Sequence, residues 1–116
     1  MNWSIDVSGS QSIQDQLVSN VLVEIESGTL QAGERLAPAA ELGEVLGVNV
    51  NTVLAAYRRL RDLGILEFRR GRSVRVTQRC DELARVADAV KSLVVLATDL
   101  GYDPDVLIAL IQEVSP

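Results

Sequence analysis

The chain has 116 residues, of which 47% are hydrophobic and 23% charged, and its formal net charge is −5. This length suits one domain or a small domain with an appendage, and the apolar fraction excludes a disordered chain. Histidine is absent and cysteine occurs only at Cys80, which excludes the usual Cys/His zinc sites, Ser-His and Cys-His catalysis and an internal disulfide. Apolar runs are far too short for a membrane helix, and the start has no signal-like stretch. We therefore expect a soluble cytoplasmic protein that is not an enzyme and needs no metal or cofactor.

The spacing of apolar residues predicts three helices, over residues 13–27, 38–46 and 50–63. Ser12 and Asn49 are good N-caps for the first and third helices. A glycine follows the end of each helix, as is common after a helix. The residues that define the three apolar stripes are Ile13, Leu17, Val21 and Ile25, then Leu42, Val45 and Leu46, then Val53, Ala56, Tyr57, Leu60 and Leu63.

A β-hairpin is predicted next, because residues 65–68 and 73–78 alternate between apolar and polar side chains. Arg70-Gly71-Arg72 makes a tight basic turn between the two strands. We expect the apolar side of the hairpin to share one core with the third helix. That core comprises Val53, Ala56, Tyr57, Leu60, Leu66, Phe68, Val74 and Val76.

Two further helices follow the hairpin. An apolar stripe runs from residue 83 to Leu100 and is broken by Gly101, and Asp103-Pro104-Asp105 caps and begins the last helix. Two helices alone cannot bury both of their stripes, so we expect them to associate with a second copy of the chain, with packing on the preceding domain as the alternative. The expected dimerisation residues are Leu83, Val86, Val90, Leu93, Val94, Leu100, Leu107, Leu110, Ile111 and Val114.

The predicted fold is mainly α-helical with a small β-hairpin. A winged helix-turn-helix domain spans residues 1–78 and a short two-helix dimerisation tail spans residues 79–116, because two helices joined by a tight turn and followed by a hairpin form the winged motif. A small-molecule effector, if there is one, would bind at the dimer interface or between the tail and the winged domain.

Positive charge is concentrated where this motif lies. Residues 57–79 hold eight arginines and two acidic residues, a balance of +6, whereas the remaining residues sum to −11. Arginine binds phosphate or a guanine edge bidentately, and asparagine pairs with adenine in the major groove. Capping alone for Asn49 and a solvated basic face are the structural alternatives. The candidate DNA-binding residues are Arg35, Asn49, Asn51, Thr52, Arg58, Arg59, Arg70, Gly71 and Arg72.

A series of short motifs runs through more than half of the chain: Gly28 to Leu36, Glu41-Leu42, Leu46 to Val53, Ala56-Tyr57, Leu60, Gly64-Ile65 and Arg70-Gly71. In this order and spacing they resemble the amino-terminal domain of GntR-family bacterial transcription regulators. The Asn-x-Asn-Thr-Val motif, the start around Trp3-Ser4-Ile5 and the short tail are similar to the YtrA-like subgroup. The resemblance implies a repressor that binds a palindromic duplex operator as a homodimer.

The sequence departs from this family pattern at two places. Where the family usually reads Leu-Pro-Ser-x-Arg-Glu-Leu, the arginine that family members direct at DNA is Ala40 here. The wing reads Arg70-Gly71-Arg72-Ser73 instead of Arg-Gly-x-Gly, and Arg75 stands where an aromatic residue is usual. The operator sequence of relatives therefore does not transfer to this chain.

Two other classes of function compete with DNA binding. A winged helix can instead bind a protein, in which case the arginines would face an acidic partner and duplex DNA would not bind with a steep salt dependence. The other class is an enzyme, for which only carboxylates and Cys80 are available. Asp99, Asp103 and Asp105 lie at a helix junction, where capping is a better explanation than a metal site. Cys80 is better interpreted as an inert or merely oxidisable thiol than as a redox sensor.

Overall fold

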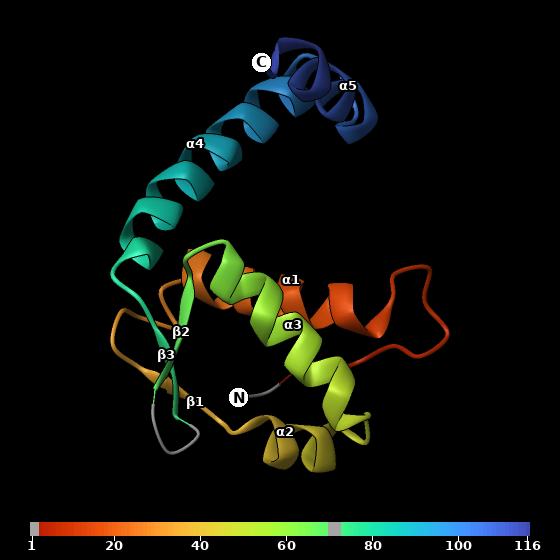
Figure 1. Ribbon diagram of the computed structural model, residues 1–116. Coiled ribbons are helices and arrows are strands. Elements are labelled where there is room, and N and C mark those ends of the chain that lie inside the picture. The colour runs from red at the N-terminus through yellow and green to blue at the C-terminus, as the bar shows by residue number, and fades with distance from the viewer. Residues whose placement is uncertain (1–2, 70–72) are drawn as a thin grey trace. The chain divides into compact units, whose positions relative to one another are not determined.

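The computed structural model describes residues 3–69 and 73–116. The chain divides into two compact units, Met1–Ala84 and Arg85–Pro116. The architecture is mostly helical with a small antiparallel sheet, which confirms the predicted fold class (Figure 1). The helices are α1 (Ile13–Glu26), α2 (Ala39–Leu46), α3 (Val50–Asp62), α4 (Arg79–Asp99) and α5 (Pro104–Val114), and the strands are β1 (Arg35–Leu36), β2 (Leu66–Arg69) and β3 (Ser73–Val76).

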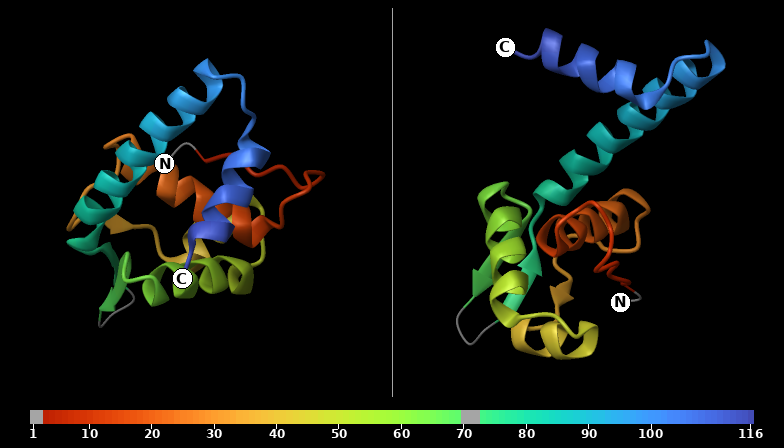
Figure 2. Two further views of the ribbon diagram at one scale, coloured as in Figure 1. Left: turned by 90° about the horizontal axis from the view of Figure 1, so that it is seen from above. Right: turned by 90° about the vertical axis from the view of Figure 1, so that its right-hand side faces the viewer.

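The core of the first unit is built around α3. Its stripe of Val53, Ala56, Tyr57 and Leu60 is fully buried, as its spacing predicted. One face of α1 packs against α3, and the two helices lie side by side in Figures 1 and 2. The sheet closes the core, and seven of the eight residues predicted to share it are buried. The other buried core residues are Leu17, Val18, Val21, Ile25, Leu30, Leu36, Ala39, Leu42, Ile65 and Cys80.

Three predicted core positions are wrong. Val45 is 73% exposed because α2 has only eight residues and buries a single face, on which Leu42 lies. Leu63 is 55% exposed because α3 ends before it, and Ile65 fills the core instead. Phe68 is 39% exposed at the outer end of β2, and the guanidinium carbon of Arg61 lies 5.1 Å from the centre of its ring.

A third strand, which the sequence did not predict, completes the sheet. The strand order is β1-β3-β2, all antiparallel, with Arg35 opposite Arg75 and Leu36 opposite Val74. β1 has two residues, too few for an alternating pattern to be read from the sequence. The strand is defined by its hydrogen bonds to β3. This pairing extends one residue before β1, because the Val76 amide donates to the Glu34 carbonyl at 2.9 Å.

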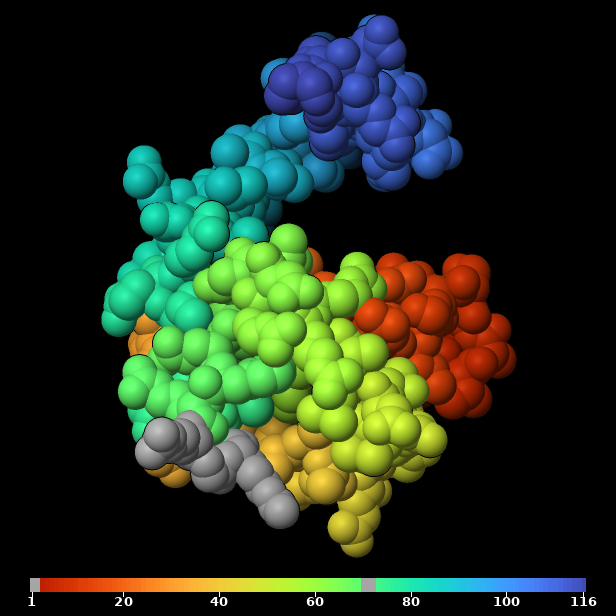
Figure 3. Space-filling view, in the orientation of Figure 1, coloured from red at the N-terminus to blue at the C-terminus, as the bar shows by residue number. Residues whose placement is uncertain are grey.

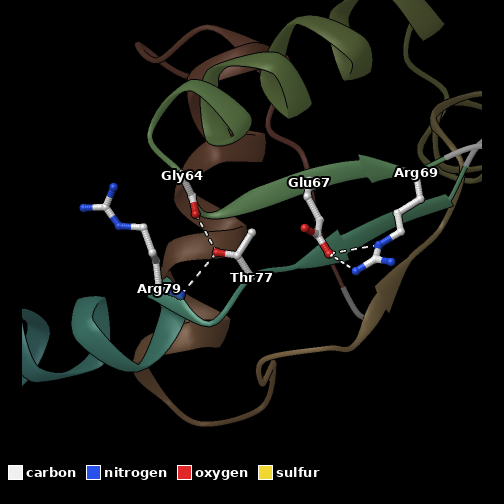
Figure 4. A network of polar contacts seen from close by, with 5 residues as sticks. All are labelled: Gly64, Glu67, Arg69, Thr77 and Arg79. Atoms are coloured by element: carbon white, nitrogen blue, oxygen red, sulfur yellow. Dashed lines mark hydrogen bonds and ion pairs between the residues drawn. The ribbon is translucent and has the colours of Figure 1, made fainter.

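The wing is joined to α3 and α4 by a small network around Thr77 (Figure 4). The Thr77 hydroxyl donates to the Gly64 carbonyl at 2.5 Å and accepts from the Arg79 amide at 3.2 Å. Gly64 has φ +81°, a conformation that favours glycine. The network holds the Arg79 amide at the start of α4, and this helix belongs partly to the first compact unit and partly to the second.

The second unit consists of the rest of α4 and α5. Ala97 is its only buried residue, and the Tyr102 amide donates to the Ala97 carbonyl at 2.8 Å where the chain turns. Asp103 caps α5 by accepting a hydrogen bond from the Val106 amide at 3.2 Å, as predicted. Across residues 3–69 and 73–116, none of the helices has the length and apolar character required to cross a membrane.

The register of α3 gives a direct test of this core. Leu60 is fully buried and Leu63 is mostly exposed, although both belong to the same predicted stripe. We expect Leu60→Ala to lower the free energy of unfolding by about 2–5 kcal/mol, because it leaves a cavity. Leu63→Ala should cost no more than about 0.5 kcal/mol. Urea denaturation measures both, and equal losses would contradict the register.

Candidate nucleic-acid interface

The turn between α2 and α3 is held by two glycines. Gly47 ends α2 with φ +69°, and the Val48 amide donates to the Gly43 carbonyl at 2.9 Å. A Cβ atom on Gly43 would lie 2.8 Å from the Val48 carbonyl oxygen, so only glycine allows the turn to approach α2 this closely. These contacts fix where α3 begins, which is the end of the helix predicted to meet the bases.

Asn49 caps α3, as predicted. Its side-chain oxygen accepts a hydrogen bond from the Asn51 amide at 2.7 Å. The structural role that the sequence left open for Asn49 is therefore present. Only the oxygen takes part in the cap, and within residues 3–69 and 73–116 the side-chain NH₂ group has no acceptor, so it can donate to an external one.

The outward face of α3 carries Asn51 and Arg58. The two residues are seven positions apart, so they lie two turns apart on the same stripe, opposite the buried one. Both are exposed. Among the described residues, neither side chain has a hydrogen-bond or ion-pair partner. The amide of Asn51 and the guanidinium group of Arg58 are thus both available to an external ligand on the same face.

Thr52 and Arg59 lie on the flank of α3 that faces α1. Thr52 is half-buried, and the Arg59 guanidinium pairs with the Asp15 carboxylate of α1 at 2.5 Å. The hydrogen bond from Arg59, together with the one from Ser12, holds the pKa of Asp15 below its ordinary value of 3.8. Arg59 therefore has an internal partner, and its contact with DNA stays a prediction.

Several other arginines of the basic segment also have local partners. Arg61 pairs with Asp62 at 3.3 Å, and Arg69 pairs with Glu67 at 2.8 Å (Figure 4). Arg79 pairs with Glu82 at 3.3 Å. The predicted wing-tip residues Arg70, Gly71 and Arg72 lie outside the described residues. Fewer of these arginines are therefore available to a ligand than the number of arginines in the segment suggests.

The structure brings together a pair of arginines that the sequence did not. Arg35 of β1 and Arg75 of β3 are directly opposite each other on the outward face of the sheet. Like charges at such positions repel. The Nε atom of Arg75 is buried and has no hydrogen-bond partner among the described residues, and the neighbouring Glu67 binds Arg69. Of the two, only Arg35 was a DNA-binding candidate from the sequence, because the pairing depends on the unpredicted strand β1.

The N-terminus of α2 is open. Pro38 is its N-cap residue and makes no side-chain hydrogen bond to the first turn. Ala40, which replaces the arginine of the family pattern, is exposed in that turn. The free backbone amides carry partial positive charge and suit an anion.

A tight helix-turn-helix followed by a two-stranded wing defines a winged helix-turn-helix domain of the DNA-binding class. Residues 13–76 match the family model described as bacterial regulatory proteins, gntR family. The chain belongs to the GntR family, and it is a transcriptional regulator with a DNA-binding helix-turn-helix. This confirms the resemblance noted in the sequence.

Named relatives agree with this assignment. The chain is 38% identical over 98 residues to the HTH-type transcriptional regulator Rv1152 of Mycobacterium tuberculosis, covering 84% of this chain and 80% of the relative. It is 26% identical over 117 residues to the HTH-type transcriptional repressor YtrA of Bacillus subtilis, covering 96% and 90% of the two proteins. A GntR-family transcriptional regulator from Listeria monocytogenes superimposes with a TM-score of 0.65 at 27% identity, covering 93% of this chain and 99% of that one.

The Asp15–Arg59 pair predicts a pH-dependent stability. Since the pKa of Asp15 is lowered in the folded protein, its ionised form stabilises the fold above the ordinary value of 3.8. That contribution is lost as the pH falls through the lowered pKa. We expect Asp15→Asn to be less stable than the wild type at neutral pH, with the difference vanishing in acid. Thermal unfolding across pH measures this, with Asp88→Asn in the second unit as the control; a gap that persists in acid would contradict the pairing.

Proposed function

We propose that the protein is a cytoplasmic repressor that binds a palindromic duplex operator as a homodimer. The observation that carries this proposal is that the side chains of Asn51 and Arg58, on the outward face of α3, have no partner in the part of the chain that the structure describes. A helix of this kind enters the major groove, where asparagine selects adenine and arginine selects guanine or binds phosphate. The name of the YtrA relative, a transcriptional repressor, supports repression.

The remaining candidates act on the backbone of the duplex. Asn49 and Thr52 lie at the N-terminal end of α3, whose dipole favours phosphate. The open first turn of α2 binds a second phosphate through its amides, in place of the arginine that Ala40 replaces. Arg70 and Arg72 at the wing tip are assigned to the adjacent minor groove or its phosphates.

Arg35 and Arg75 extend the phosphate-binding surface along the sheet. Their mutual repulsion falls when a phosphate lies against them, so bound DNA stabilises the pair. Neither has an ion pair among the residues that the structure describes.

The tail is assigned to dimerisation. Most of the residues of its predicted stripe are exposed on α4 and α5, including Leu93 and Ile111. Leu83 is the exception in α4, since it packs against the core of the first unit, and Leu107 of α5 is half-buried. Val95, Leu96 and Ile108 add exposed apolar surface outside the stripe. Apolar surface on this scale favours association, and a two-fold dimer would present α3 helices to half-sites about 10 base pairs or a multiple apart.

Selection of bound duplexes from a random pool tests DNA binding and supplies the operator. We expect an enriched palindrome whose affinity falls steeply with salt. On that duplex, Arg58→Ala should weaken binding, whereas Arg85→Ala in the second unit should not. Asn51→Ala should relax base preference at one position by about 1–3 kcal/mol. Replacing Arg70 and Arg72 by alanine should weaken binding to all sequences and flatten the salt slope.

The absence of any enriched duplex at low salt would contradict the proposal. A winged helix that binds an acidic protein would then explain the arginines better. If a duplex is enriched but Asn51→Ala and Arg58→Ala bind it in the same way as the wild type, α3 does not contact the bases of that site.

The dimer is tested by Leu93→Asp, which places a charge in the middle of the exposed stripe of α4. We expect sedimentation at micromolar concentration to give a dimer for the wild type and a monomer for this variant. Binding to the palindrome should fall far more than binding to a half-site, because linked sites are lost. Leu63→Asp, which alters an exposed leucine of the first unit, is the control. A monomeric wild type would overturn the assignment.

A further inference from the structure

Apolar side chains lie between the two polar side chains that are proposed to meet the bases. Leu54 is three positions after Asn51 and four before Arg58, so it adjoins both of them on the helix surface. Ala55 is four positions after Asn51 and three before Arg58, and it adjoins both as well. Leu54 and Ala55 are partly exposed. α3 is described over its whole length, and between Asn51 and Arg58 this face offers only apolar side chains.

Val50 extends this apolar surface to the start of α3. It is the first residue of the helix, one turn before Leu54, and it is 39% exposed. Val50 and Leu54 border an open hollow, whose other walls are the first turn of α2 and the facing ends of β2 and β3. Figure 3 shows α3 at the surface of the first unit. An external ligand can therefore reach these side chains, and we call Val50, Leu54 and Ala55 the apolar patch of α3.

The position of the apolar patch on the helix gives it a meaning. A single exposed apolar residue on a protein surface needs no explanation. These three residues, however, occupy the end of the helix that is proposed to enter the major groove. Base edges in that groove carry hydrogen-bond donors and acceptors, and the apolar group that they display is the 5-methyl group of thymine. An apolar side chain against a polar base edge would leave a donor or acceptor without a partner, which costs free energy. Among the bases, the patch therefore matches thymine.

We propose that Val50 and Leu54 contact the 5-methyl group of a thymine in each half-site of the operator, next to the base pair whose adenine Asn51 contacts. This inference rests on the proposed function and adds a base that the protein selects. Ala55 is small, so the base edges can approach the middle of the helix closely. An A·T pair displays the N6 and N7 atoms of adenine and the methyl group of thymine in the major groove. Adjacent A·T pairs therefore suit an asparagine with apolar neighbours.

Replacement of thymine by uracil removes the 5-methyl group and leaves the base pairing unchanged. In the palindrome selected from the random pool, each thymine of one half-site is replaced in turn, with the same change in the other half-site. Fluorescence anisotropy measures the affinity of the full chain for each duplex. We expect one position at which the loss is about fourfold for each half-site, as the burial of one methyl group implies. The absence of such a position would overturn the proposal.

Val50→Ala and Leu54→Ala test whether these side chains detect the methyl group. In each variant, the ratio of the affinities for the thymine and uracil duplexes should fall toward one, because the shorter side chain no longer covers the methyl group. Leu54 also packs against the core, but this ratio compares two duplexes with the same protein, so partial unfolding of the variant does not change it. Val23→Ala removes the same atoms from a valine that is 61% exposed on α1, and it should leave the ratio unchanged.

Three results with these variants would overturn the proposal. If both α3 variants retain the ratio of the wild type, the effect of the methyl group comes from the deformability of the DNA. If they weaken binding to the thymine and uracil duplexes equally, Val50 and Leu54 contact the sugar-phosphate backbone instead. A ratio that also falls in Val23→Ala would show that the effect is indirect.

Failure of the proposed function is distinguishable from failure of this inference. A protein that enriches no duplex overturns both. A protein that binds its operator with the same affinity whether thymine or uracil is present overturns only the contact with the methyl group.

Discussion

Four side chains on one face of α3 pack at the same time against α1, α2 and β2, and this shared burial constrains the rest of the first unit. Tyr57 adds a polar tie, since its buried hydroxyl donates to the Ala37 carbonyl at 2.7 Å, just before α2. Because the same face of α3 packs against three elements, rotation of the helix about its axis would disrupt all three contacts. The opposite face, with Asn51 and Arg58, is therefore presented in a single orientation. Packing thus fixes the orientation of the surface that is proposed to meet DNA, although none of the packed residues belongs to that surface.

Charge in this protein acts locally. An overall charge of −5 would repel a polyanion at long range. Among residues 3–69 and 73–116, however, three guanidinium groups without a carboxylate partner, those of Arg35, Arg58 and Arg75, belong to the winged unit. Salt screens the distant acidic residues over roughly 8–10 Å, whereas contacts with phosphate are made at close range. The ion pairs divide the arginines into those that brace the fold, such as Arg59, and those left to bind an external anion, such as Arg58.

The two compact units separate two tasks. The first buries nearly all of the core, while the second has one buried residue and a largely apolar surface. A helix pair of this kind gains stability by association, so the proposed oligomerisation and DNA binding lie on different parts of one chain.

The helices, the wing strands, the caps at Ser12, Asn49 and Asp103, and the class of protein could be predicted from the amino-acid sequence. Those features depend on local spacing and on capping chemistry, which involve residues close together in the chain. Features that depend on distant neighbours emerge only in the folded protein. The two-residue strand β1 exists through its pairing with β3, and that pairing sets Arg35 against Arg75. The partner of Arg59 is 44 positions away in the chain, and Phe68 is 39% exposed although it lies on the apolar side of its strand. Periodicity indicates which face of an element is apolar, but the length and position of its neighbours decide how much of that face is covered.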